Sequence, residues 1–318
     1  MSASVAAGSS ISASHVMGAR NRWRYFLAPV VFVGVSAIVF AIIGALFVPL
    51  YVGAVVGVLW AIVLTGIALA KADAIILRIS RAVPANETDY RRIHNIVEGL
   101  CVTIGVQKPD VYVIDDEAPN ALVVAQGRSR NAIAVTIGLL DQLDRIQLEG
   151  VVAQLVARLR SGQVGTLSRI AVLIGVPLII GESLQRRKWP NGGRVARDGD
   201  PSASTRASDA FFAAIGSVFL LSAYVIGPLM KWLGASSTDI EDDIAACRLT
   251  RYPPGLANAL DVLSTNCTVT RSSSMATAHL WFAESLSGLD DAGRQARLHN
   301  LFTSHSPIGE RFALLKEM

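Results

Sequence analysis

The chain has 318 residues, of which 52% are hydrophobic and only 17% are charged, and its mean hydropathy is positive. This composition is typical of a membrane protein with a modest water-exposed part. The formal net charge of +4 is small and the basic residues gather beside apolar runs, so we expect no nucleic-acid partner. Cys101, Cys247 and Cys267 are too few and too scattered for a disulfide framework or a thiolate zinc site, and we expect them to be buried small residues.

The amino-terminal region divides into a polar tail and a long apolar run. Residues 1–18 are rich in Ser and Ala without a periodic apolar face, so we expect a disordered tail. The uncharged run over 25–70 is about twice as long as the ~20 residues that cross a bilayer. We therefore predict a transmembrane helical hairpin over 19–82 that turns near Pro49.

Basic residues flank this hairpin on both sides. They are Arg20, Arg22 and Arg24 before the apolar run, and Lys71, Arg78 and Arg81 after it. Because positive residues tend to stay on the cytoplasmic side, we expect both outer ends of the hairpin in the cytoplasm. Gly53 and Gly57 form a G-x-x-x-G pair that could seat another helix closely.

The composition becomes that of a soluble domain from Asn86 onward. Apolar residues at helical spacing after a polar start predict an amphipathic helix that ends at Gly105. Short apolar runs separated by turn residues then predict three strands, over 110–114, 121–125 and 132–136, the last of which alternates.

Gly138 leads into the next predicted helix, which extends to Gly162. Val151, Leu155 and Leu159 recur four residues apart along it, so they lie on one face. We therefore expect this helix to be buried.

Two further apolar segments follow within 166–233. The first, over 170–181, is short for a span and contains Pro177, which is compatible with a thin crossing or with a re-entrant element. The second, over 210–230, is a clear span, and a basic polar loop at 184–209 separates the two. A crossing by the first segment places the basic loop outside, against the positive-inside tendency. We favour about four crossings, which put both soluble segments in the cytoplasm.

Several distinct short motifs are spread from about residue 90 to the end of the chain. They read K-P-D-V-Y-V-I-D-D-E-A-P-N-A at 108–121, A-V-T and G-L-L within 134–140, L-E-G-V at 148–151, A-T-A-H-L at 276–280, and L-F-T-S-H-S-P followed by E-R within 301–311. Together they closely resemble the HtpX family of membrane zinc metallopeptidases, relatives of the CAAX prenyl proteases.

The resemblance implies an α+β membrane protein. Its zincin-like domain, helices with a small β-sheet, is expected to be built from 83–165 and 234–318. It also implies a multi-pass protein of a bacterial-type inner (plasma) membrane, with the domain and both termini cytoplasmic.

The zinc motif of that family is replaced in this chain. Alignment through 148–151 places the histidine, glutamate and second histidine of H-E-x-x-H at Gln154, Leu155 and Arg158. A neutral amide binds zinc poorly, a guanidinium stays charged, and leucine offers no lone pair to a general base.

Other positions of the family's site keep related residues. The third zinc ligand and an aspartate four residues later correspond to Asp239 and Asp243, and the carboxyl-terminal histidine and arginine correspond to His305 and Arg311. One carboxylate does not make a catalytic zinc site, so we expect no intact catalytic residue, no metal and no cofactor. We expect Arg158 to pair with Asp239 or Asp243, the alternative being that it points to solvent.

The remaining candidates have simpler interpretations. His279 is expected to pack or to form a hydrogen bond, and the acidic residues at 115–117 to form a solvated turn. Asn120, Ala121 and Gln126 lie where the family has the edge of its substrate cleft, so an exposed strand edge there could bind an extended peptide without cutting it.

We therefore predict an inactive, HtpX-like membrane pseudoprotease. It would bind or hold a protein partner, or an unfolded membrane-protein segment, at the bilayer. Two alternatives remain open: an active membrane metalloendopeptidase of protein quality control with atypical ligands, and a purely structural membrane subunit.

Overall fold

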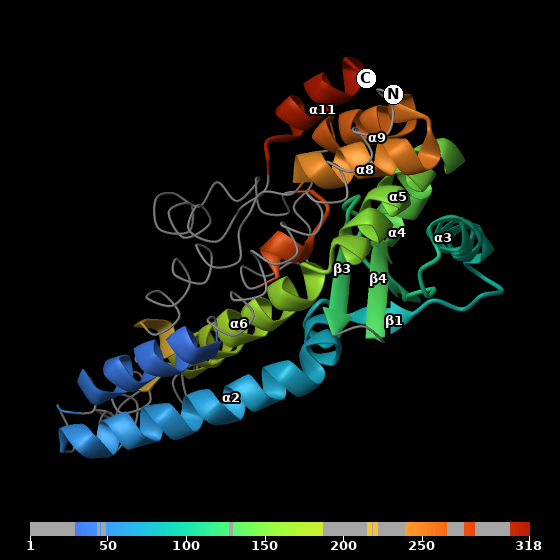
Figure 1. Cartoon of the computed structure of the whole chain (residues 1–318). Helices are drawn as coiled ribbons and strands as arrows, with labels where there is room; N and C mark the ends of the chain where they lie inside the picture. Colours follow the sequence, from blue (N-terminus) through green and yellow to red (C-terminus); the bar gives the residue numbers. More distant parts are fainter. Residues whose placement is uncertain are drawn as a thin grey trace, which may run out of the picture.

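The computed structural model describes residues 29–42, 45, 49–126, 130–186, 215–217, 219–221, 239–265, 277–283 and 306–318. The predicted tail, nearly all of the basic loop and most of the predicted span at 210–230 lie outside these ranges, as do Cys267 and His305. The sheet and the helices around it form one end of the molecule, and long apolar helices lead away from it (Figure 1).

The first two apolar helices fold back on each other. Helix Pro29–Ile42 precedes α2 (Leu50–Ile79), and Pro49 lies directly before α2. At Gly57 a side chain would be only 2.7 Å from the Cβ atom of Phe40, so the second glycine of the G-x-x-x-G pair does seat the neighbouring helix.

The third apolar segment is longer than the sequence pattern indicated. Helix α6 (Val164–Arg186) is continuous through Pro177, and its residues Val164–Gly181 are long and apolar enough to cross a membrane. It lies beside α2, and most of this stretch is buried within the protein. Among the described residues α2 and α6 are the two helices of sufficient length, and four crossings remain a prediction.

A four-stranded sheet holds the predicted strands together with one that was not predicted. Its order is β1 (Ala82–Pro84), β2 (Asp110–Ile114), β4 (Arg130–Thr136) and β3 (Ala121–Gln126). β2 and β4 are parallel, and the other two pairs are antiparallel. The amphipathic helix forms as predicted, as α3 (Arg91–Ile104), and Gly105 ends it in the left-handed region at a φ of 68°.

The sheet separates two hydrophobic cores because strand side chains alternate between its faces. One face, with Val123 and Ile133, packs under α3 and the other helices of the sheet end. The opposite face, with Leu122 and Ala134, packs against α2 and α6. The sheet therefore rests directly on the apolar helices (Figure 1).

The helix predicted from Gly138 onward is in fact two helices. α4 (Ile137–Gln142) ends at Leu143, and α5 (Arg145–Ser161) begins after Asp144. Asp144 and Gln147 form a capping box in which each side chain accepts from the other's backbone N–H. As predicted, α5 is buried, and it packs against α8 (Asp239–Thr250) and α9 (Pro253–Thr265).

Two cysteines are buried and free, as expected. Cys101 lies on α3 and Cys247 on α8. Burial raises the pKa of both thiols, that of Cys247 to about 11, so at neutral pH they stay protonated and behave as small apolar groups.

Gly150 permits close packing of α5 on α9. A Cβ atom there would be 2.7 Å from the backbone nitrogen of Leu256. We expect Gly150→Ala to lower the free energy of unfolding by about 1–3 kcal/mol, because overpacking exceeds the gain in helix propensity. Gly99→Ala on α3 is the matched control, since nothing lies within 4 Å of its Cβ position, and it should be stabilising. Urea unfolding in detergent measures both, and equal effects would contradict the close contact.

Candidate functional site

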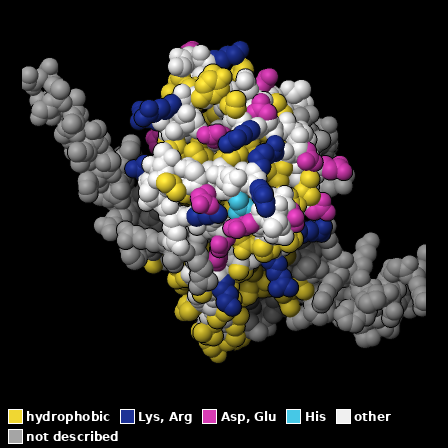
Figure 2. All heavy atoms as spheres, turned by 90° about the vertical axis from the view of Figure 1, so that its right-hand side faces the viewer, with side chains coloured by type: hydrophobic (Ala, Val, Ile, Leu, Met, Phe, Trp, Pro, Cys, Tyr) yellow, Lys and Arg dark blue, Asp and Glu magenta, His cyan; other side chains and the backbone are white. Residues whose placement is uncertain are grey.

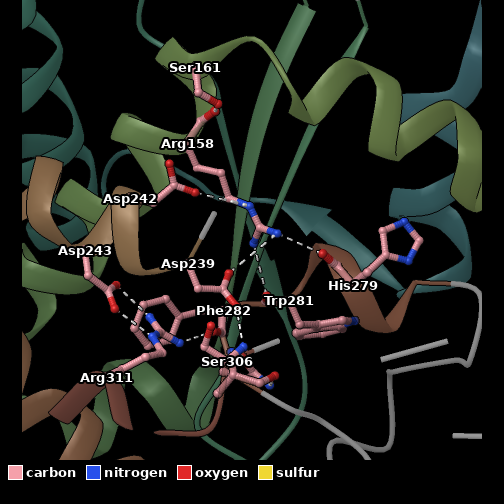
Figure 3. Close-up of polar contacts among 12 residues, drawn as sticks. Arg158, Ser161, Asp239, Asp242, Asp243, His279, Trp281, Phe282, Ser306 and Arg311 are labelled. Carbon is pink, nitrogen blue, oxygen red and sulfur yellow. Dashed lines mark hydrogen bonds and ion pairs between the residues drawn. The ribbon is translucent and has the colours of Figure 1, made fainter. Parts of the chain in front are cut away.

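The residues aligned with the family's zinc site gather between three helices. Gln154, Leu155 and Arg158 lie on α5, Asp239 and Asp243 on α8, and Arg311 on α11 (Ile308–Lys316). All six side chains are buried. Figure 3 shows the two arginines pointing toward the aspartates of α8 and toward the chain segment 279–282.

Arg158 lies between carboxylates and main-chain carbonyls. Its Nη2 atom is 4.0 Å from Oδ1 of Asp239, and its Nε atom is 3.8 Å from Oδ2 of Asp242. It donates hydrogen bonds to the carbonyl oxygens of His279 (2.9 Å) and Trp281 (3.3 Å). The guanidinium thus points inward to Asp239, one of the two partners expected from sequence, and not to solvent.

Asp242 is the site residue that the sequence comparison missed. It lies three residues after Asp239, which puts both on the same face of α8. On α8, only Asp239 and Asp243 align with residues of the family's site. Helical spacing could have identified Asp242, because a carboxylate three residues after Asp239 faces Arg158 as well.

Asp239 also contacts the carboxyl-terminal segment. Its Oδ2 atom accepts a hydrogen bond of 3.0 Å from the backbone N–H of Ser306. This residue follows His305, whose role stays a prediction because it lies outside the described ranges. The carboxylate therefore bridges Arg158 on one side and the start of the last segment on the other.

Asp243 belongs to a second, tighter pair. Arg311 donates two hydrogen bonds of 2.7 Å to its two oxygens, a third of 3.0 Å to the carbonyl oxygen of Phe282, and its guanidinium lies 4.8 Å from the centre of the Phe282 ring. Burial raises the pKa of Asp243, and the bonds from Arg311 oppose that rise. The pair satisfies two buried charges through direct hydrogen bonds.

Gln154 and Leu155 supply no acid–base chemistry. Both are fully buried, and Leu155 belongs to the core under the sheet. The amide nitrogen and oxygen of Gln154 have no hydrogen-bond partner within the described part of the chain. A buried amide of this kind destabilises the fold by about 1–3 kcal/mol, so packing holds it in place, not bonding.

The centre does not fit a zinc ion. In the described ranges, no group of three or more His, Cys, Asp or Glu side chains is arranged to hold a metal. The guanidinium of Arg158 lies within 4.0 Å of both Asp239 and Asp242, so a dication bound there would meet a positive charge. Leu155, at the glutamate position, cannot accept a proton from a bound water.

The strand edge proposed for peptide binding is not exposed at Asn120 and Ala121. Both residues are buried, and the backbone N–H of Phe282 donates a 2.7 Å hydrogen bond to the carbonyl oxygen of Ala121. The Asn120 side chain bonds to both the N–H and the C=O of Ala283.

A peptide could add along this part of β3 only by displacing the chain's own segment. That segment includes Trp281 and Phe282, both fully buried, and removing each from the core costs about 1.5–3 kcal/mol. Farther along β3, the N–H of Ala125 donates to the hydroxyl of Ser168 on α6. Gln126 ends β3, and its side chain lies outside the described part.

Two other candidates have local roles. The imidazole of His279 lies 3.1 Å from the carbonyl oxygen of Leu167, which is the hydrogen-bonding role expected for it. The acidic turn is solvated at Asp115 and Glu117, but the expectation was wrong for Asp116, which is buried and accepts a hydrogen bond from the N–H of Ala118. This local bond stabilises the turn between β2 and β3.

Comparison with known proteins gives two kinds of match. A protein of Dictyoglomus thermophilum named "Protease HtpX homolog" is 32% identical over 248 residues, which cover 78% of this chain and 76% of that protein. A protein of the same name from Limosilactobacillus reuteri is 26% identical over 309 residues, 94% of this chain and 98% of that protein. No family model matches the chain. Among solved structures, S. mikatae Ste24p aligns at 14% identity with a TM-score of 0.39, covering 96% of this chain and 64% of Ste24p.

Proposed function

Since the chain belongs to the family of HtpX protease homologues, we propose that it is a pseudoprotease of that family, which binds or holds a protein at the membrane without cutting it. The chain contains no H-E-x-x-H sequence at any position. Gln154, Leu155 and Arg158 align with the three defining residues of that motif, so two zinc ligands and the general base are replaced.

The position of Arg158 carries this proposal. A positive side chain on α5 neutralises the carboxylates of α8, where the family's motif would use histidines to hold a dication. An unpaired buried carboxylate would cost several kcal/mol, so the arginine supports the fold in the absence of a metal. The same substitution opposes zinc binding, which removes both the Lewis acid and the activated water of a metallopeptidase.

The proposed location follows from the apolar helices. α2 and α6 fit a membrane location, and large apolar side chains are exposed along α2. We place the protein in a bacterial-type inner membrane, with the sheet end and both chain termini in the cytoplasm. The proposed partner is a protein, or an unfolded segment of a membrane protein.

Metal analysis of the purified full-length protein tests the loss of chemistry. We expect far less than one zinc per chain and no chelator-sensitive cleavage of casein. The matched comparison is the quadruple variant Gln154→His, Leu155→Glu, Arg158→His and Asp239→Glu, which restores the family's ligands and should gain zinc. One tightly bound zinc per wild-type chain, with cleavage that a chelator stops, would overturn the proposal in favour of an active metalloendopeptidase.

A further inference from the structure

The exposed surface of α2 changes from apolar to basic at Lys71. The large apolar residues exposed on this helix all lie before it: Leu50, Tyr51, Val55, Val56, Leu59, Ile62, Val63, Ile67 and Leu69. At ~1.5 Å per residue they extend along ~30 Å of helix, the thickness of a bilayer's hydrocarbon core. Lys71 is exposed and departs from helical geometry (φ −144°, ψ 26°). In a bilayer crossed by α2, the edge of the hydrocarbon would therefore fall at Lys71.

Two more exposed basic residues follow just beyond this edge. Arg78 lies in the last turn of α2, about 10 Å along the axis from Lys71, and Arg81 follows the end of the helix. The N–H of Arg81 donates to the carbonyl oxygen of Arg78, which keeps the two residues together. Figure 2 shows Lys and Arg side chains along the border between the apolar end of the molecule and the rest.

The side chains of Lys71, Arg78 and Arg81 are not paired with an acidic residue in the described part of the chain. Among the described residues none of the three side chains makes an ion pair or a hydrogen bond. Buried arginines of this protein behave differently, since Arg158 and Arg311 both face carboxylates.

The one acidic residue on the same stretch of α2 is Asp73, which is half-buried. Burial of Tyr112 on the adjacent strand β2 raises the pKa of its hydroxyl, and the carboxylates of Asp110 and then Asp73 add to that rise. The Oδ1 atom of Asp73 is buried, so this carboxylate does not extend into the solvent beside the three basic residues. The stretch as a whole keeps an excess of positive charge at the hydrocarbon edge.

We propose that Lys71, Arg78 and Arg81 form a binding surface for the headgroups of anionic phospholipids. Phosphate oxygens accept hydrogen bonds from ammonium and guanidinium groups, and each basic residue near an anionic membrane surface strengthens binding about fivefold. Such a surface would hold the sheet against the membrane, because α2 leads directly into β1. This inference rests on a membrane location and is independent of whether the protein cuts peptides.

Competition between two lipids tests the surface. Full-length protein in detergent receives equal amounts of phosphatidylglycerol and phosphatidylcholine, and native mass spectrometry measures the ratio of the two that stay bound. We expect the wild type to retain phosphatidylglycerol preferentially. The triple variant Lys71→Gln, Arg78→Gln and Arg81→Gln should lose most of this preference, by one to two orders of magnitude if the charges act independently.

The matched control removes three exposed arginines of the sheet end: Arg91→Gln, Arg145→Gln and Arg248→Gln. This control should keep the wild-type ratio, and the charge-preserving variant Lys71→Arg, Arg78→Lys and Arg81→Lys should keep it as well. An equal loss in both neutral triple variants would show an effect of net charge alone and would overturn the proposal. So would an unchanged ratio in the Lys71, Arg78 and Arg81 variant, with its folding verified by circular dichroism.

Discussion

Replacing Arg158 with methionine is expected to lower the free energy of unfolding by about 3–5 kcal/mol. The variant removes the positive charge beside Asp239 and Asp242, and it removes the two hydrogen bonds to the carbonyls of His279 and Trp281. Methionine fills a similar volume, so the change reports the lost charge more than a cavity. Urea unfolding in detergent, followed by circular dichroism, measures the effect.

Two further variants decide whether the carboxylates cause this loss. Arg160→Met, two residues along the same helix but exposed, should change the stability by less than about 0.5 kcal/mol. Adding Asp239→Asn and Asp242→Asn to Arg158→Met should recover part of the stability, because the uncompensated charges are gone. A loss for Arg158→Met no larger than that of Arg160→Met would show that the buried pairing does not exist.

Replacing Arg311 with methionine is expected to have an equal or larger effect, again about 3–5 kcal/mol or more. It breaks both bonds to Asp243, the bond to the carbonyl of Phe282 and the contact with the Phe282 ring. Arg311→Lys should recover only a small part, because an ammonium cannot form the two parallel bonds. The same unfolding measurement applies.

The control for the ring contact lies on the same helix. Lys316 is 4.8 Å from the centre of the Phe312 ring but is exposed, so Lys316→Met should cost less than about 1 kcal/mol. A double-mutant cycle of Arg311→Met with Asp243→Asn should give a coupling above about 1 kcal/mol. Additive effects of the two substitutions would contradict a direct pair.

Local patterns sufficed for much of the sheet end of the fold. Helix α3 follows from its periodicity and from Gly105, because it buries one face. The three longer strands follow from short apolar runs bounded by turn residues, since β3 and β4 are buried on both faces. Strand β1 could not be predicted, since three residues ending in Pro84 show no alternation. The break between α4 and α5 was readable from Asp144 and Gln147, a capping signal that the apolar pattern on either side concealed.

The site was predictable only where residues align with a known motif or share a helix. The proximity of Arg158 and Asp239 follows from the family's arrangement of its zinc ligands. The carbonyls that Arg158 binds could not be foreseen, because main-chain groups of residues 279 and 281 have no side-chain signature. For the same reason no pattern indicated that Phe282 would cover the edge of β3 at Ala121.

The helix α6 divides the charged centre in the order of synthesis. Arg158 precedes it, whereas Asp239, Asp242 and Arg311 all follow it. A growing chain that has reached only the end of α6 therefore holds an arginine that has no carboxylate to meet, and α5 cannot be buried without a charge penalty. Burial of α5 is therefore free of this penalty only once α8 has been synthesised, which couples the packing of the sheet end to the part of the chain that follows α6.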